Sequence, residues 1–183
     1  FGLLSLMTFI EARRAARRAE GRYVPLDEQN TALWDSKMIA EAEAALARAA
    51  SFKAPGRYQL EAAIQSAHVT ARLSGDDLRD TIVRLYDRLL TVAPSTGAAI
   101  ARAGALLKAG RANEAIDAVD SLDAKRLAAH QTYWATRAHV LAALGKRVEA
   151  LAAFDRAIGL TSNAAARTFL AEAKARVAAI QAS

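Results

Sequence analysis

The stretch AGALLKAGRANEAIDAVD, residues 103–120, decides the fold, because AHVLAALGKRVEALAAFD, residues 138–155, repeats its pattern 35 positions later. In each copy a small residue and the Leu three positions on share one face of a helix, and glycine is the residue that most often ends a helix. Each copy therefore predicts a helix, a glycine turn and a second helix. The paired positions are Ala103 and Ala138, Leu106 and Leu141, Gly110 and Gly145, Glu114 and Glu149, Ala115 and Ala150, Val119 and Phe154, and Asp120 and Asp155.

This repeat resembles the tetratricopeptide (TPR) family, in which the period is about 34 residues and small residues lie where paired helices cross. Residues 85–90 resemble residues 153–158 and predict a third, degenerate hairpin. A hairpin of this kind cannot bury its apolar face alone, so neighbouring hairpins must stack. We expect an all-α fold of TPR-like antiparallel helical hairpins that form a right-handed superhelix.

The composition favours helices throughout. Hydrophobic residues make up 53% of the 183 residues, and no alternating run of β-branched or aromatic residues predicts a strand. The absence of cysteine excludes disulfides and thiolate metal sites and is consistent with the cytoplasm, where we expect the protein. Residues 1–10 form the longest apolar run, shorter than the roughly 20 residues that cross a bilayer, so we expect no membrane contact. Because the chain begins at Phe1 inside an apolar helical pattern, we also expect it to be part of a longer protein.

We expect a single helical domain over residues 1–183. Its parts are a first helix with an ordered connection (1–35), degenerate hairpins (36–94), two clear repeats (95–161) and a capping helix (162–183). Asp35 or Ser36 is suited to cap the second helix, and Ser162 or Asn163 the last one. The expected helices number about nine, at 1–19, 36–50, 58–73 and 78–92, from about 95, 112, 123 and 146, and at 164–180.

The order of several short phrases resembles the C-terminal extension of one group of bacterial extracytoplasmic-function (ECF) sigma factors, in which a TPR-like domain follows a two-domain sigma core. The resemblance implies that the sigma core domains and RNA polymerase are the partners, and that upstream domains contact the DNA. The phrases that carry it are residues 3–7 with 12–14, 26–29 with Trp34-Asp35, 39–41, 58–60 with 62–64 and His68, 85–87 with 89–90 and Pro94, the repeat at Gly145, and 163–170. Residues 102–109 depart from the pattern, being richer in alanine and glycine.

Nothing in the sequence predicts catalysis. His68, His130 and His139 fall on separate expected helices, with no spacing typical of a zinc site. Gly-rich phosphate loops, serine elbows and paired catalytic carboxylates are also missing from the sequence. We therefore expect no enzymatic activity, no catalytic residues, no cofactor and no bound metal.

Two groups of residues are candidates for binding. The first, a basic patch, could follow DNA phosphates, face an acidic region of polymerase, or be ordinary solvated surface; it comprises Arg13, Arg14, Arg17, Arg18 and Arg22. The second exceeds what helix stacking requires and could be a partner or ligand surface, or a buried hydrogen-bond network that holds the connection. Its members are Asp27, Gln29, Trp34, Asp35, Tyr58, Gln59 and His68.

These patterns predict a regulatory, protein-interaction domain at the C-terminus of an ECF-type sigma factor, which modulates transcription initiation without catalysis. A free-standing TPR adaptor for a partner peptide is one alternative. A helical small-molecule sensor, with a pocket near Trp34, Tyr58 and His68, is another.

Overall fold

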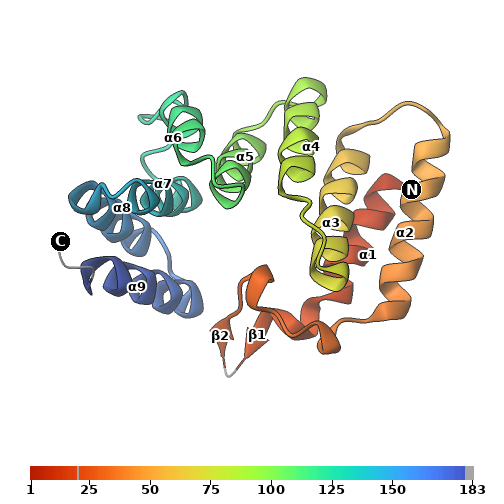
Figure 1. Cartoon of the computed structure of the whole chain (residues 1–183), viewed down its shortest axis with the longest axis horizontal. Helices are drawn as coiled ribbons and strands as arrows, with labels where there is room; N and C mark the ends of the chain where they lie inside the picture. Colours follow the sequence, from red (N-terminus) through yellow and green to blue (C-terminus); the bar gives the residue numbers. More distant parts are fainter. Residues whose placement is uncertain (20, 180–183) are drawn as a thin grey trace. The chain divides into compact units, whose positions relative to one another are not determined.

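Nine α-helices run through the residues that the structure describes, 1–19 and 21–179, in this computed structural model (Figure 1). Neighbouring helices pack as antiparallel pairs, which confirms the all-α prediction. The helices are α1 Gly2–Ala12, α2 Ser36–Ser51, α3 Arg57–Ser74, α4 Arg79–Val92, α5 Thr96–Lys108, α6 Ala112–Asp120, α7 Gln131–Ala143, α8 Arg147–Gly159 and α9 Ala164–Ala179. Short 3₁₀ turns lie at Arg14–Arg17, Leu26–Glu28 and Thr31–Leu33, and two-residue strands at β1 Arg18–Ala19 and β2 Arg22–Tyr23.

The chain divides into two compact units, which we describe separately. The first comprises residues Phe1–Glu20 and Val24–Ala98, and the second comprises residues Gly21–Tyr23 and Ala99–Ser183. The residues of α1 to α4 fall in the first unit, and those of α6 to α9 fall in the second.

Helix α1 is the centre of the first unit, because it packs against both α2 and α3 (Figure 1). Its buried side carries Phe9, which is fully buried with Trp34, Ala42 and Val69. The hydroxyl of Ser5, also fully buried, donates a 2.8 Å hydrogen bond to the carbonyl oxygen of Ala42. A small polar residue facing a small apolar one thus lets α1 and α2 approach closely while the buried hydroxyl keeps a partner.

The first helix is shorter than predicted, because it ends at Ala12 and not at Ala19. The carbonyl of Ala12 accepts a 2.9 Å hydrogen bond from the backbone N–H of Asp35, which replaces the bond that a longer helix would have made. Arg13 leaves the helical conformation, and its guanidinium is buried, where it donates to the carbonyl of Phe9 and to Gln65. The expectation of no strand was also wrong, since the chain beyond this point includes β1 and β2.

In the second unit the two repeats end their first helices in the same way. Gly110 (φ +77°) and Gly145 (φ +72°) both adopt the left-handed conformation, which costs glycine little because it has no Cβ. The following N–H of Arg111 donates to Leu106, 2.9 Å, and the N–H of Lys146 donates to Leu141, also 2.9 Å. This is the Schellman arrangement, repeated 35 residues apart. The prediction that Gly110 and Gly145 occupy equivalent turns is confirmed.

The small residues of the repeat are fully buried where the helices pack. Exposed fractions are 0% at Ala103, Ala138, Ala115 and Ala150. A side chain of one carbon at these positions leaves room for the neighbouring helix, so a larger one would have to displace it. The sequence pattern thus correctly identified four small residues that are fully buried in the helix packing.

The prediction of a helix from about Asp123 was wrong, because α7 begins only at Gln131. The carboxylate of Asp123 accepts from the N–H groups of Lys125 and Arg126, as at a helix N-terminus, but only turns follow, and the N–H of His130 donates to the carbonyl of Leu127 at 2.9 Å. His130 caps α7 through its Nδ1, which accepts from the N–H of Tyr133 at 3.3 Å. The indole N–H of Trp134 donates to Ala128 and holds the connection down.

The caps predicted for other helices are present. A carboxylate oxygen of Asp35 accepts from the N–H of Met38 at 2.9 Å and begins α2. The side-chain oxygen of Asn163 accepts from the N–H of Ala166 at 3.1 Å and begins α9. The predicted end of the last helix, Ile180, lies outside the described residues.

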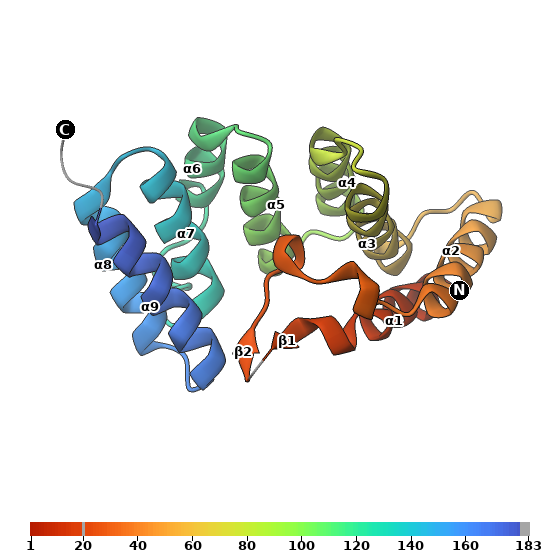
Figure 2. The ribbon, with the colours of Figure 1, turned by 60° about the horizontal axis from the view of Figure 1, so that its bottom comes forward.

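Helices α7, α8 and α9 are successive neighbours in the second unit (Figure 2). His139 of α7 lies edge-on to Phe154 of α8, with ring centroids 5.0 Å apart, and 6.3 Å from Phe169 of α9. Burial, and to a smaller extent the charge of Arg176, lowers the pKa of the His139 imidazole below its ordinary value of 6.5. The neutral imidazole therefore belongs to the folded state.

Replacing Ala138 with Leu should overpack the contact of α7 and lower the free energy of unfolding by about 1–3 kcal/mol. The matched control is Ala143→Leu, at an exposed position of the same helix. This substitution should change the free energy of unfolding by less than about 0.5 kcal/mol. Urea denaturation of both variants measures the difference. Equal stability of the two variants would contradict the close contact at Ala138.

Acidification should destabilise the protein through His139. Because its folded pKa is lowered, the unfolded chain takes up a proton first, so the stabilisation is complete above pH 6.5 and is lost as the pH falls below it. We expect the Tm to fall more steeply between about pH 7.5 and about pH 5.5 in the natural protein than in His139→Gln. Parallel Tm curves would show that the neutral imidazole contributes nothing.

Candidate interaction surface

The outward side of α1 is apolar, although α1 lies in the middle of its unit. We call Leu3, Leu4, Met7 and Ile10 the α1 face; their exposed fractions are 46%, 57%, 61% and 37%. Side chains three and four positions apart share one side of a helix, so these residues form one stripe opposite Phe9. Contiguous exposed apolar side chains mark interaction sites more often than isolated ones do.

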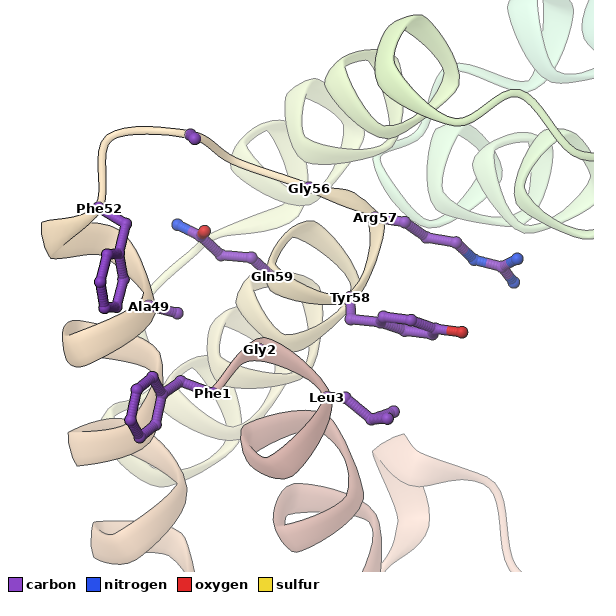
Figure 3. Close-up of a pocket in the computed structure, with 10 residues that line it drawn as sticks. Phe1, Gly2, Leu3, Ala49, Phe52, Gly56, Arg57, Tyr58 and Gln59 are labelled. Carbon is purple, nitrogen blue, oxygen red and sulfur yellow. The ribbon is translucent and has the colours of Figure 1, made fainter.

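A pocket of about 370 Å³ lies at the N-terminal end of the α1 face (Figure 3). Phe1 stacks on Phe52 from the end of α2, with ring centroids 6.1 Å apart and an angle of 10° between the planes. Leu3 and Tyr58 point to the other side in Figure 3 and continue the α1 face toward α3. This N-terminal pocket is lined by Phe1, Gly2, Leu3, Ala49, Phe52, Ala54, Gly56, Arg57, Tyr58 and Gln59.

A backbone contact fixes the floor of this pocket. A Cβ atom added to Gly2 would lie 2.8 Å from the backbone nitrogen of Gln59 and 3.0 Å from its Cα. Real Cβ atoms do not come this close to backbone, so only glycine lets the first turn of α1 lie against the first turn of α3. The position of Leu3 beside Tyr58 depends on this contact.

Arginine side chains border the N-terminal pocket. The guanidinium of Arg48 lies 4.3 Å from the centroid of the Phe1 ring, and that of Arg57 lies 5.6 Å from the centroid of Tyr58. Arg57 also pairs with Glu61 at 2.9 Å, and this hydrogen bond raises the pKa of the guanidinium. No carboxylate lines the pocket among the described residues. Its aromatic surface is therefore bordered by positive charge.

A second pocket, of about 360 Å³, lies at the other end of α1. Trp34 is nine-tenths buried in its wall, and its indole N–H has no acceptor within the described part of the chain. On its rim Arg14 pairs with Glu11 at 3.0 Å. The second pocket is lined by Glu11, Ala12, Arg14, Ala15, Ala32, Leu33, Trp34, Asp35 and Met38.

The candidate binding group from the sequence does not form a single site. Tyr58 and Gln59 line the N-terminal pocket, and Trp34 and Asp35 line the second pocket. Gln29 is buried.

Gln29 holds the connection between α1 and α2. Its side-chain NH₂ group donates to the carbonyl of Val24 at 3.2 Å, and its backbone carbonyl accepts from the guanidinium of Arg72 of α3 at 3.1 Å. Asp27 is exposed on the connection, and His68 is partly buried on α3. The structural interpretation, a network that holds the connection, therefore describes Gln29, whereas the aromatic and amide members at the pockets remain candidates for binding.

The predicted basic patch is also divided. Arg13 is buried, with 4% of its surface exposed and its guanidinium 5.8 Å from the Trp34 ring centroid. Arg14 and Arg18 are exposed, and Arg17 is partly buried. Arg22 belongs to the second unit, where its guanidinium donates to both oxygens of Glu172 at 2.7 and 2.9 Å.

The α1 face, Phe52 and Arg48 were not among the candidates from the sequence. The apolar run at residues 1–10 was visible there, but an apolar helix in a stacked array is ordinarily buried. The available signal was that apolar side chains occupy all sides of this helix, more than contacts with two neighbouring helices can cover.

The chain is similar over part of its length to a family of unknown function, and it is similar to one uncharacterized protein. Residues 1–50, which include α1 and most of α2, match the model of the Family of unknown function (DUF6596). The chain is 35% identical over 170 residues to the uncharacterized protein R00370 of Rhizobium meliloti (strain 1021). The match covers 92% of this chain but only 40% of the relative. No solved structure matches the chain.

Among the described residues, no helix is both long enough and apolar enough to cross a membrane. No group of three or more His, Asp or Glu side chains in the same residues is arranged to hold a metal ion.

Replacing Gly2 with Ala should push α1 away from α3 and lower the free energy of unfolding by about 1–3 kcal/mol. The control is Gly104→Ala within α5, where an added Cβ meets no atom within 4 Å and should stabilise the helix by about 0.5–1 kcal/mol. Thermal denaturation compares the two. Opposite signs are the expected result, and a Gly2→Ala protein as stable as the natural one would contradict the close approach.

Proposed function

We propose that this chain is a regulatory, protein-interaction domain of an ECF-type RNA polymerase sigma factor, which modulates transcription initiation without catalysis. The α1 face is the observation that carries the interaction role. Helix α1 is held on its inner side by α2 and α3, so its outward apolar side chains are presented in a fixed arrangement. A preorganised apolar surface binds a partner at a lower entropic cost than a mobile one.

The sigma-factor part of the proposal is supported by the order of the phrases that resemble the C-terminal extension of that group. Three of these phrases lie within the segment that matches the DUF6596 family: residues 3–7 with 12–14, 26–29 with Trp34-Asp35, and 39–41. The relative from Rhizobium meliloti is longer than this chain, which spans 40% of its length, and a longer protein is what an extension of a sigma core requires. The partners proposed on this basis are the sigma core domains and RNA polymerase, with DNA contacted by upstream domains.

The mechanism we propose is a bias on the conformation of the sigma core. A domain that binds one conformation of its neighbour more tightly shifts the population toward that conformation. Docking of the α1 face on the core or on polymerase would thus change how often the core engages a promoter. No chemical step is needed.

The small-molecule sensor is a second candidate because of the two pockets. Their volumes, about 370 and 360 Å³, lie at the lower end of the range for ligand sites. Binding of a small molecule there would be read out through the same helices that carry the α1 face.

Transcription from a cognate promoter by the complete sigma factor tests the proposal. We expect that deletion of residues 1–183 changes promoter activity, and that Met7→Asp reproduces the direction of this change because it places a charge in the α1 face. The control is Val148→Asp, at an isolated side chain on α8 that is 78% exposed, which should leave activity unchanged. Unchanged activity after the deletion would refute the regulatory role.

A further inference from the structure

We propose that the α1 face and the N-terminal pocket together bind an amphipathic helix of the partner whose flanking side chains are acidic. The inference deepens the proposed function, on which it rests for the existence of a protein partner. It adds the secondary structure and the charge of the segment that is bound.

The spacing of the α1 face matches a helix. Leu3, Met7 and Ile10 are separated by four and three residues, which aligns them along the axis of α1. Helix α1 has 11 residues and is about 16 Å long, enough for two to three turns of a partner helix. Apolar ridges with this spacing fit into the grooves of another helix that carries apolar residues at the same intervals.

The N-terminal pocket sets the charge of that helix. Arg48 lies over the ring of Phe1, and Lys53 is exposed beside Phe52 in the same turn of chain. Arg57 lies over Tyr58 and is shared with Glu61, the carboxylate that pairs with it. Carboxylates of a partner would meet these cations at the edge of an aromatic surface, where part of the surrounding water is displaced and charge-assisted hydrogen bonds are stronger than in bulk water.

The opposite end of α1 also carries positive charge. Arg14 pairs with Glu11 there, and Arg18 is exposed just beyond it. Basic residues therefore lie at both ends of the stripe, so the charges favour an acidic partner and do not fix the direction in which it binds.

A membrane surface fits the structure less well. Helix α1 buries Ser5, Phe9 and Ala12 against its neighbours, so it cannot rotate or sink into a bilayer as a free amphipathic helix does. A second copy of this chain would bring an equally basic pocket with it. An acidic helix is thus the occupant that the charges favour.

Photocrosslinking in the complete protein tests the inference. A photoreactive p-benzoylphenylalanine at Met7, with the same group at Val148 as control, is activated in cells, and the crosslinked peptides are sequenced by mass spectrometry. We expect that the Met7 position captures a segment with apolar residues at helical spacing and Asp or Glu on its flanks, and that the Val148 position does not.

The double variant Arg48→Glu with Lys53→Glu should reduce that crosslink at least about tenfold, the loss expected when charge complementarity is reversed. The matched variant Arg84→Glu, on the exposed side of α4, should leave it unchanged. Binding of the captured segment, as a synthetic peptide, to the natural chain and to the double variant checks the same difference by fluorescence anisotropy.

Several outcomes would overturn the inference: no crosslink at Met7, a crosslink to a second copy of this chain, binding to anionic vesicles in place of protein, or a captured segment without acidic flanks. The inference and the proposed function fail separately. Capture of an acidic helix from a protein outside the transcription machinery would keep the inference and refute the sigma-factor role. A deletion that changes transcription without any crosslink at Met7 would do the reverse.

Discussion

The close approach of helix backbones at residues with little or no side chain is the constraint on which this structure depends. Ala103, Ala115, Ala138 and Ala150 have no exposed surface, and Gly2 lies against the backbone of Gln59. At such contacts the larger side chains on either side, such as Phe154, can interdigitate without leaving a void. The same constraint places the α1 face, because the depth at which α1 lies between α2 and α3 determines which of its side chains stay outside.

Local signals in the sequence were sufficient for most of the fold. The left-handed glycines Gly110 and Gly145, together with the caps Asp35 and Asn163, act within a few residues of themselves, so they can be recognised without knowledge of the rest of the chain. The error at the end of α1 arose where a distant group competed. The N–H of Asp35 takes the carbonyl of Ala12 and ends α1, an interaction that no local pattern in the first helix announces.

The candidate site was less predictable than the fold for the same reason. Arg13 has the same neighbours in sequence as the exposed Arg14, yet the fold buries one and leaves the other in solvent. The chemistry of an arginine run is visible in the sequence, but its exposure depends on Trp34 and Gln65, which come from other segments. The α1 face illustrates the converse, since its apolar character was evident while its exposure could be seen only once its neighbours were in place.

The identical turns at Gly110 and Gly145 bear on how the length of such a chain can change. An insertion of one residue within α7 would move Gly145 away from the left-handed position and rotate every later side chain about the axis by roughly 100°. The connection at residues 121–130 is not helical, so it has no helical register to keep. Trp134 holds it through one hydrogen bond, from its indole N–H to the carbonyl of Ala128. A change in length should therefore be tolerated between hairpins, or as a whole repeat, whereas each hairpin keeps a fixed internal register.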